Sequence, residues 1–151
     1  MKKVVLPYSR KHRLIKIVGF TVISFPAFMA FSVYTTQRFI RIQTDHLAVR
    51  NLYDIHSAQG QFKSSKGRHG TLKELAEAGL IEPHFAGDQK PLKYSYWISD
   101  LSSESFCVHA DRKSWIAGYH DFNMSEDGIL HFQKSETIGS IPRGQGDTTG
   151  Y

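Results

Sequence analysis

The side chains best suited to chemistry in this chain are its eight histidines, the aspartates near them and one cysteine. No two histidines have the four-residue spacing that places a pair of imidazoles on one helix face for metal binding. His109, His120 and His131 fall in successive segments expected to be strands, where they could converge with Asp111 and Asp121 nearby. Surface or half-buried histidines explain this pattern better, so we expect no metal and no cofactor.

Nucleophilic and phosphate-binding chemistry find no support either. The chain has no Gly-x-Ser-x-Gly sequence, and Gly67 and Gly70 lack the Lys-Ser or Lys-Thr that completes a phosphate-binding loop. Cys107 is the one cysteine, so no intrachain disulfide can form, and its apolar neighbours indicate a small buried hydrophobic residue. Asp111 and Asp121 are interpreted as solvated residues of a turn and a strand end. We therefore expect no catalytic residue and no enzyme.

The net charge of +5 could indicate a nucleic-acid partner, but its distribution argues against one. The first sixteen residues hold six of the nineteen Lys and Arg and no acidic residue, which leaves thirteen basic against fourteen acidic residues in the rest of the chain. The basic residues of the leader are Lys2, Lys3, Arg10, Lys11, Arg13 and Lys16. This asymmetry is typical of a topology signal beside a membrane segment.

That segment is the uncharged stretch of residues 17–34. As a helix it would reach roughly 27 Å, close to the hydrocarbon thickness of a bilayer. A buried helix of a soluble protein is usually shorter and has a polar face, and the small-x-small site of a cleaved secretory signal does not follow. We predict a transmembrane helix whose N-terminus stays in the cytoplasm, so that residues 35–151 lie outside the inner membrane.

Residues 35–66 are predicted to form a long amphipathic helix that continues from the membrane segment. Ala48, Leu52, Ile55 and Phe62 follow one another at intervals of four, three and seven residues and form one apolar stripe. We assign Leu52, Ile55 and Phe62 to packing against a sheet. The charged residues are assigned to the polar faces of this helix: Arg38, Arg41, Asp45, Arg50 and Asp54.

A reversal and a second, short helix follow. Residues 66–70 contain two glycines that permit a sharp turn. Thr71 and Glu74 have the spacing of a capping box, and Gly79 is placed to end the helix as its C-terminal cap. Pro83 prevents the helix from continuing into the loop of residues 84–93.

The second half of the chain changes to strand periodicity. Strands are expected at residues 94–99, 105–110, 119–124 and 129–132, and Asp127-Gly128 is a hairpin signal. The fold class is therefore α+β, with the transmembrane helix continuing into a long helix packed on a small antiparallel meander. The expected divisions are a basic leader (1–16), the membrane helix (17–34), an extracytoplasmic domain (35–132) and a disordered tail (133–151).

This order of segments resembles the type IV pilin-like proteins, which are the pilins and the pseudopilins of type II secretion. Gly19 and Phe20, followed by Thr-Val-Ile, resemble the site at which prepilin peptidase cuts between Gly and Phe. Residues 48–59, 67–75 and 79–81 resemble the helix, turn and short helix of the major-pseudopilin type, and the resemblance covers roughly residues 10–132. It implies a structural role in a pilus or secretion machinery, with the bilayer, other pilin-like subunits and the peptidase as partners.

One position departs from the family pattern. Family members carry a Glu at the fifth position after cleavage, which is thought to pair with the N-terminal amine of a neighbouring subunit, and this chain has Ser24 there. A lone Glu in lipid is costly, so Ser24 favours a plain anchor. A second hypothesis therefore stays open: a single-pass anchored binding or sensing module without filament assembly. Asp121, Glu126 and Asp127 fit no calcium-binding loop.

Overall fold

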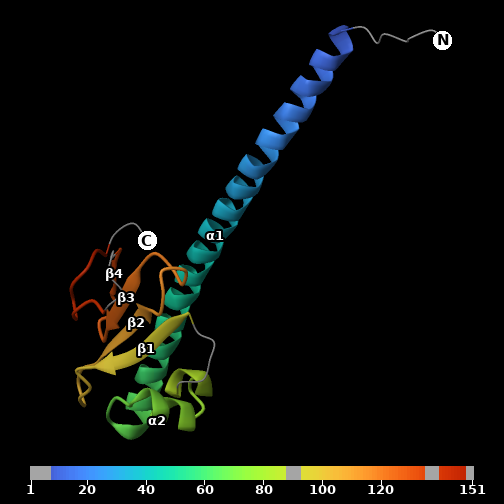
Figure 1. Cartoon of the computed structure of the whole chain (residues 1–151). Helices are drawn as coiled ribbons and strands as arrows, with labels where there is room; N and C mark the ends of the chain where they lie inside the picture. Colours follow the sequence, from blue (N-terminus) through green and yellow to red (C-terminus); the bar gives the residue numbers. More distant parts are fainter. Residues whose placement is uncertain (1–7, 88–92, 135–139, 149–151) are drawn as a thin grey trace, which may run out of the picture. The chain divides into compact units, whose positions relative to one another are not determined.

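The computed structural model describes the backbone of residues 8–87, 93–134 and 140–148, and side chains from residue 26 onward within these ranges. The elements, in chain order, are α1 (Tyr8–Lys66), α2 (Leu72–Glu77), the 3-10 helix η1 (Pro83–Ala86), β1 (Tyr94–Ser99), β2 (Cys107–Arg112), β3 (Asp121–Ser125) and β4 (Leu130–Gln133) (Figure 1). The chain divides into two units, Met1–Phe39 and Ile40–Tyr151, and each is described by itself.

The first unit contributes the N-terminal part of α1, in which every described side chain is exposed. Phe28, Phe31 and Tyr34 are 67, 66 and 64% exposed, and residues 26–37 carry no charge. The hydroxyls of Thr35 and Thr36 donate to helix carbonyls one turn earlier, so these polar groups are satisfied within the helix. Residues 26–34 of α1 therefore present mainly apolar side chains at the surface of this unit.

The predicted membrane segment falls largely outside the described side chains. Within the described part of the chain, no helix carries an apolar run long enough to cross a bilayer. The predicted span of residues 17–34 begins before the first described side chain, that of residue 26. Gly19, Phe20 and Ser24 belong to α1, and their side chains also lie outside the described residues. The span therefore stays a prediction.

In the second unit, two local signals end one helix and begin the next. α1 ends at Lys66, and Gly67 follows with a φ of +73°, a conformation that glycine adopts without strain. The capping box at Thr71 is confirmed, because the Thr71 hydroxyl accepts from the Glu74 amide and the Glu74 carboxylate accepts from the Thr71 amide. Gly79 has a φ of +69° and closes the C-terminal cap of α2.

The loop expected after α2 begins instead with a short helix. Pro83 opens η1, since the fixed φ of proline suits the first helical position, where its missing amide is not needed. Gly79 thus ends α2, and Pro83 starts the next element. Residues 88–92, which complete the predicted loop, lie outside the described residues.

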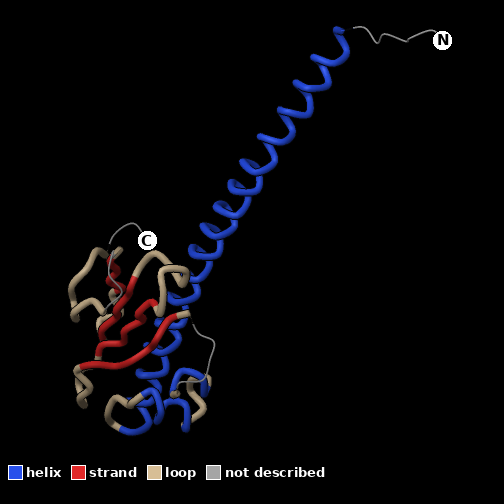
Figure 2. The backbone as a smooth tube through the Cα atoms, in the orientation of Figure 1, coloured by secondary structure: helices blue, strands red, loops and turns tan. Residues whose placement is uncertain are grey.

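The four-stranded antiparallel meander is confirmed, with the strands in the order β1-β2-β3-β4 (Figure 2). β1 has the predicted bounds, whereas β2, β3 and β4 each begin one or two residues later than predicted. Two causes are visible. Ser105 turns back to bond with Ser102 in the β1–β2 loop, and Tyr119 donates its amide to a carboxylate of α1 rather than to a strand.

One face of the sheet packs with α1 into a single hydrophobic core. Leu52 and Ile55 are fully buried and Phe62 is 4% exposed, and all three belong to one buried cluster with side chains of the sheet. The buried members from β1, β2 and β3 or their flanks are Tyr94, Phe106, Val108, Ala110, Phe122 and Met124, and Leu130 and Phe132 of β4 pack against the cluster as partly buried residues. Register pairs such as Val108–Met124 and Ala110–Phe122 place alternate residues on this face.

The C-terminal residues correct the expectation of a disordered tail from residue 133. β4 extends to Gln133, and Asp147 pairs with Phe132 through two backbone hydrogen bonds of 2.9 and 2.8 Å. Ile141 is buried, and the Asn123 amide nitrogen lies within hydrogen-bond distance of three carbonyls between residues 141 and 145. The polar composition misled the prediction, because one buried apolar residue and backbone pairing suffice to hold this segment.

Candidate functional site

One buried polar group of the second unit with several partners is the carboxylate of Asp45, on α1. It is 2% exposed and accepts hydrogen bonds from the Tyr94 hydroxyl at 2.6 Å and from the Tyr119 amide at 3.0 Å. His120 Nδ1 lies 2.9 Å from its second oxygen. Asp45 therefore connects α1 to the first strand and to the segment before β3. The sequence pattern predicts that Asp45 lies on a polar face of the helix, and this prediction is wrong because its side chain is buried.

Gly118 is required for this arrangement. A Cβ at this position would lie 2.0 Å from the Asp45 oxygen and 2.2 Å from the Tyr94 hydroxyl, far inside contact distance. The backbone of the segment can approach the carboxylate only because the residue has no side chain. Asp45 lies three residues before Ala48, so the helical stripe continues back to it, and this spacing is the signal that could have identified it.

A second polar residue of the same stripe, Gln59, secures the turn after α1. Its amide donates to the Gly70 carbonyl at 2.6 Å and accepts from the Gly70 amide at 2.9 Å. A Cβ at Gly70 would lie 2.9 Å from the Phe62 ring, so the turn also packs directly on the core. The buried stripe of α1 therefore combines apolar packing with two polar residues, Asp45 and Gln59, that each serve defined partners.

Asp121 and Arg112 form a buried ion pair, with side chains 0 and 2% exposed and 2.9 Å between Nη2 and Oδ2. The carboxylate also accepts from the Arg112 amide at 2.7 Å. The expectation that Asp121 is a solvated strand-end residue is therefore wrong. Burial requires a charged partner for a carboxylate, and the partner stands on the neighbouring strand, where a sequence pattern does not reveal it.

The three strand histidines do not converge. His109 stacks on Trp97 with ring centroids 4.0 Å apart, and burial lowers the pKa of its imidazole. His131 pairs in register with Asn123, which separates it from His109, while His120 turns to Asp45. Among the described residues no group of three or more His, Cys, Asp or Glu side chains could hold a metal ion.

A Ser–His contact on the outer face of the sheet lacks the geometry of a catalytic triad. Ser99 Oγ lies 2.8 Å from His109 Nε2, a distance that suits a nucleophile and a base. The nearby Asp111 carboxylate, however, accepts from the Trp97 indole at 2.6 Å rather than from His109. Burial raises the pKa of Asp111. We assign these contacts to holding β1 on β2.

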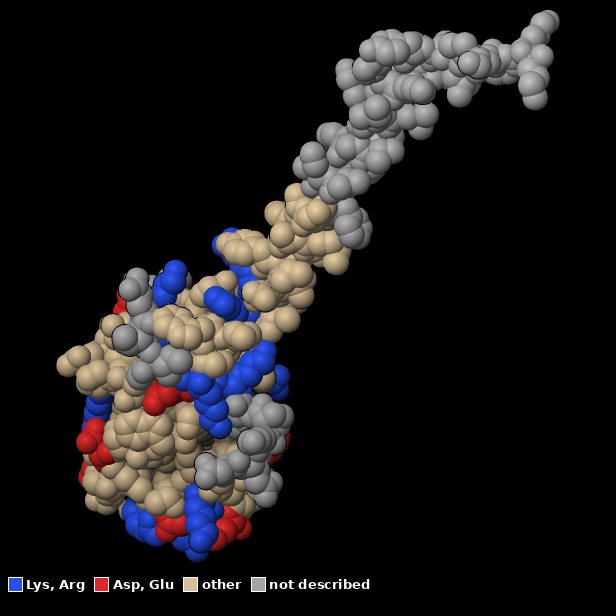
Figure 3. Space-filling model, in the orientation of Figure 1, with Lys and Arg blue, Asp and Glu red and all other residues tan. Residues whose placement is uncertain are grey.

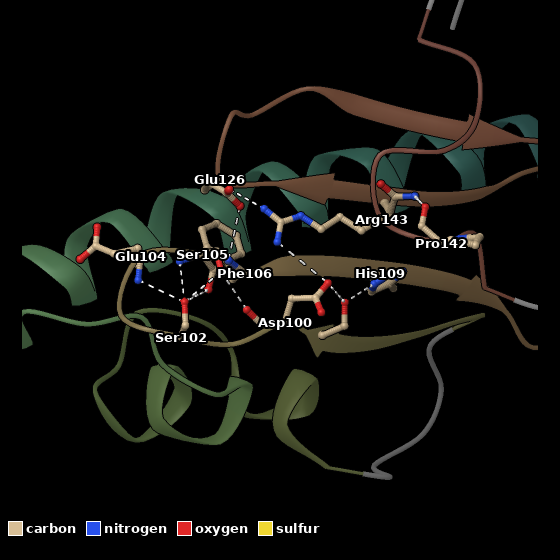
Figure 4. Close-up of polar contacts among 11 residues, drawn as sticks. Asp100, Ser102, Glu104, Ser105, Phe106, His109, Glu126, Pro142 and Arg143 are labelled. Atoms are coloured by element: carbon tan, nitrogen blue, oxygen red, sulfur yellow. Dashed lines mark hydrogen bonds and ion pairs between the residues drawn. The ribbon is translucent and has the colours of Figure 1, made fainter.

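The C-terminal segment joins the two hairpin ends through Arg143 (Figure 4). Its guanidinium pairs with Glu126 of the β3–β4 turn and lies 4.0 Å from Asp100 of the β1–β2 loop. Asp100 has a φ of +52°, an uncommon conformation for a residue with a side chain. Cys107 is buried nearby, and burial raises the pKa of its thiol, so it is the small core residue that the sequence predicted.

Two shallow hollows flank η1. One, of about 500 Å³, lies between η1, α2 and β1 and includes Phe85, Tyr96 and Trp97 in its lining. The other, of about 640 Å³, lies between η1 and α1 and includes Asn51, Leu80 and Pro83. Both offer surfaces for binding.

An exposed apolar turn lies close to Asp45. The Ala117 amide donates to the Ser114 carbonyl at 3.0 Å, which places Trp115 and Ile116 at the two central positions of the turn. Their side chains are 54 and 61% exposed. The sequence reasoning passed over this pair, although two large apolar residues between Ser114 and Gly118 are an unusual turn composition.

Comparisons of the chain with protein-family models, with curated proteins and with solved structures found no match.

Proposed function

We propose that this chain is a pilin-like, pseudopilin-type structural membrane protein of a type IV pilus or type II secretion machinery. The observation that carries the proposal is the exposed apolar surface of residues 26–37 on a helix of 59 residues. Apolar surface of this extent is stable only against lipid or other apolar helices. The second unit already buries its own core with the stripe of α1 that contains Leu52 and Ile55. The remaining apolar helix is therefore available for the bilayer or for neighbouring subunits.

The role of the leader follows from the same proposal. Residues 1–16 carry six basic residues, which keep the N-terminus in the cytoplasm. Cleavage between Gly19 and Phe20 removes all six charges and leaves residues 20–34 as an apolar run of roughly 22 Å, short for an independent span. A processed subunit is then poised to leave the bilayer and bury its helix among other subunits.

The test is the N-terminal mass of the protein extracted from membranes of cells with an active prepilin peptidase. We expect a mass lower by residues 1–19. Gly19→Leu should abolish this shift, whereas Ser24→Glu, which restores the family residue, should retain it. A protein fused to a reporter after residue 148 should be active only outside the cytoplasm. A cytoplasmic reporter signal would contradict the whole topology.

The second candidate is a single-pass anchored binding or sensing module without filament assembly. Ser24 favours it, because the Glu that pairs with a neighbouring subunit in the family is missing. The hollow beside β1, with four aromatic residues in its lining, is a place where a ligand could bind. The same mass measurement separates the two candidates: an intact N-terminus in the presence of the active peptidase assigns the chain to the second.

A further inference from the structure

The Trp115–Ile116 turn exposes its two large apolar side chains to solvent at the tip of the β2–β3 connection. Turn centres usually hold Gly, Pro, Asn, Asp or Ser, because these residues suit the backbone and water. Contact of an indole and a branched aliphatic side chain with water is unfavourable. Covering both side chains with another apolar surface would lower the free energy. The tip is thus built for contact with a partner surface.

The turn is fixed to the helix rather than free. Ala117 and Gly118, directly behind the tip, are buried, and the next amide, that of Tyr119, donates to Asp45 of α1. Asp45 lies near the start of the second unit, which begins at Ile40. The tip is therefore held at the end of this unit through which the chain enters it.

Cations surround the tip. Lys93 and Lys113 are exposed and adjacent, since the Lys113 amide donates to the Lys93 carbonyl. Arg41 and Lys134 both lie over the ring of Tyr119, at 5.4 and 5.9 Å. Figure 3 shows several Lys and Arg side chains near this end of the second unit, with acidic side chains also visible there.

Two carboxylates near this charge are buried, whereas that of Asp111 is partly exposed and accepts from the Trp97 indole. The side chains of Asp45 and Asp121 are 3 and 0% exposed and are directed at inward partners. The exposed part of the surface therefore pairs an apolar tip with positive charge. Tryptophan beside lysine and arginine is the composition that proteins use at the interface between water and a lipid bilayer with anionic headgroups.

We propose that the Trp115–Ile116 turn enters the headgroup region of a bilayer that contains anionic lipid. The inference rests on the membrane anchoring of the proposed function. Residues 35–39 separate the predicted anchor from the second unit, and five residues span at most about 18 Å when fully extended. The entry end of the second unit must therefore stay near the bilayer surface, where the turn docks the head onto the membrane that holds the anchor.

The experiment uses the full chain reconstituted in vesicles of phosphatidylcholine with phosphatidylglycerol, some carrying bromine on the lipid chains near the headgroup. The chain has two tryptophans, so the difference between wild type and Trp115→Phe reports Trp115, while Trp115→Phe alone reports Trp97. We expect bromolipid to quench the Trp115 emission and leave that of Trp97 unchanged. Lys93→Gln with Lys113→Gln should reduce the quenching, and Ile116→Ser should reduce it further.

Flotation of the vesicles separates the failure of this inference from the failure of the anchor. A chain that floats but shows no quenching of Trp115 overturns the docking turn and leaves the anchor standing. A chain that does not float overturns both. Equal quenching in purely neutral vesicles overturns the assignment to anionic lipid. A blue shift of the Trp115 emission that depends on protein density, without quenching by bromolipid, would show that a second copy of the chain covers the turn. This result overturns the proposal.

Discussion

Two stretches of the same helix, residues 26–39 and residues 45–62, use apolar side chains in opposite ways. In the first, all described side chains are exposed, and the hydroxyls bond to the helix's own carbonyls. In the second, one stripe is buried, and it includes Asp45 and Gln59, which bond to named partners far along the chain. A surface that meets one specific partner can contain buried polar residues, because each polar group finds a hydrogen-bond partner there.

The largest expected effect is that of a substitution in the buried stretch, residues 45–62. Phe62→Ala should lower the free energy of unfolding of the second unit by about 3–5 kcal/mol, because it removes a buried ring and leaves a cavity. Phe31→Ala, in the exposed stretch, is the matched control and should leave the unfolding unchanged. Chemical denaturation of the detergent-solubilised full chain measures both, and equal effects of the two substitutions would show that the two stretches do not differ.

The next effect tests whether the buried stripe depends on its polar residues. Asp45→Asn should destabilise the second unit by about 2–3 kcal/mol, because the amide cannot accept all the hydrogen bonds that the carboxylate receives. Asp54→Asn, on an exposed face of the same helix, serves as the control and should have no effect. A similar unfolding midpoint for Asp45→Asn and wild type would show that the hydrogen bonds to the Asp45 carboxylate do not stabilise the fold.

A pair of glycine substitutions separates close packing from helix propensity. Gly118→Ala should destabilise by about 1–2 kcal/mol, because the added Cβ meets Asp45 and Tyr94. Gly60→Ala should stabilise by about 0.5–1 kcal/mol, since Gly60 lies inside α1 and a Cβ there meets no atom within 4 Å. Thermal unfolding should therefore shift in opposite directions for the two variants; shifts in the same direction would contradict the placement of Gly118.

The smallest effect concerns the turn beyond Phe62. The side-chain hydrogen bond from Arg68 and that from the Thr71 amide lower the pKa of Glu74 from 4.5 to about 2. The stabilisation of the folded state by the ionised Glu74 carboxylate is therefore fully present above about pH 4.5 and is lost as the pH falls toward 2. The difference in unfolding midpoint between wild type and Glu74→Gln should shrink over this range. A difference that is independent of pH would assign the effect to packing instead of charge.

Local signals in the sequence predicted the elements well. The end of α1 at Lys66, the capping box at Thr71 and the bounds of β1 depend on neighbouring residues, so periodicity and turn chemistry suffice to find them. The α+β class with a four-stranded meander followed from the same signals. Strand starts were less accurate, because the residues before β2 and β3 are held by a turn and by Asp45.

The polar contacts of the candidate site were not predictable in the same way. Asp45 reaches Tyr119 across 74 positions of the chain, and Asp121 becomes buried only because Arg112 stands on the next strand. The helical spacing can place Asp45 on the buried stripe, but it does not show which residues far along the chain are its partners. The segment around Ile141 was missed for a related reason, since a polar composition does not show that a single apolar residue is buried.

The pairing of Asp147 with Phe132 has a consequence for the order in which the second unit forms. Residues 140–148 complete the outer face of the sheet, and they are synthesised after all four strands. Synthesis in N-to-C order delivers α1 and the strands first, while Asn123 still lacks its carbonyl partners. The native unit is therefore reached only after its last described residues have been synthesised, so a chain that stops before residue 140 keeps an unfinished, proteolysis-sensitive sheet.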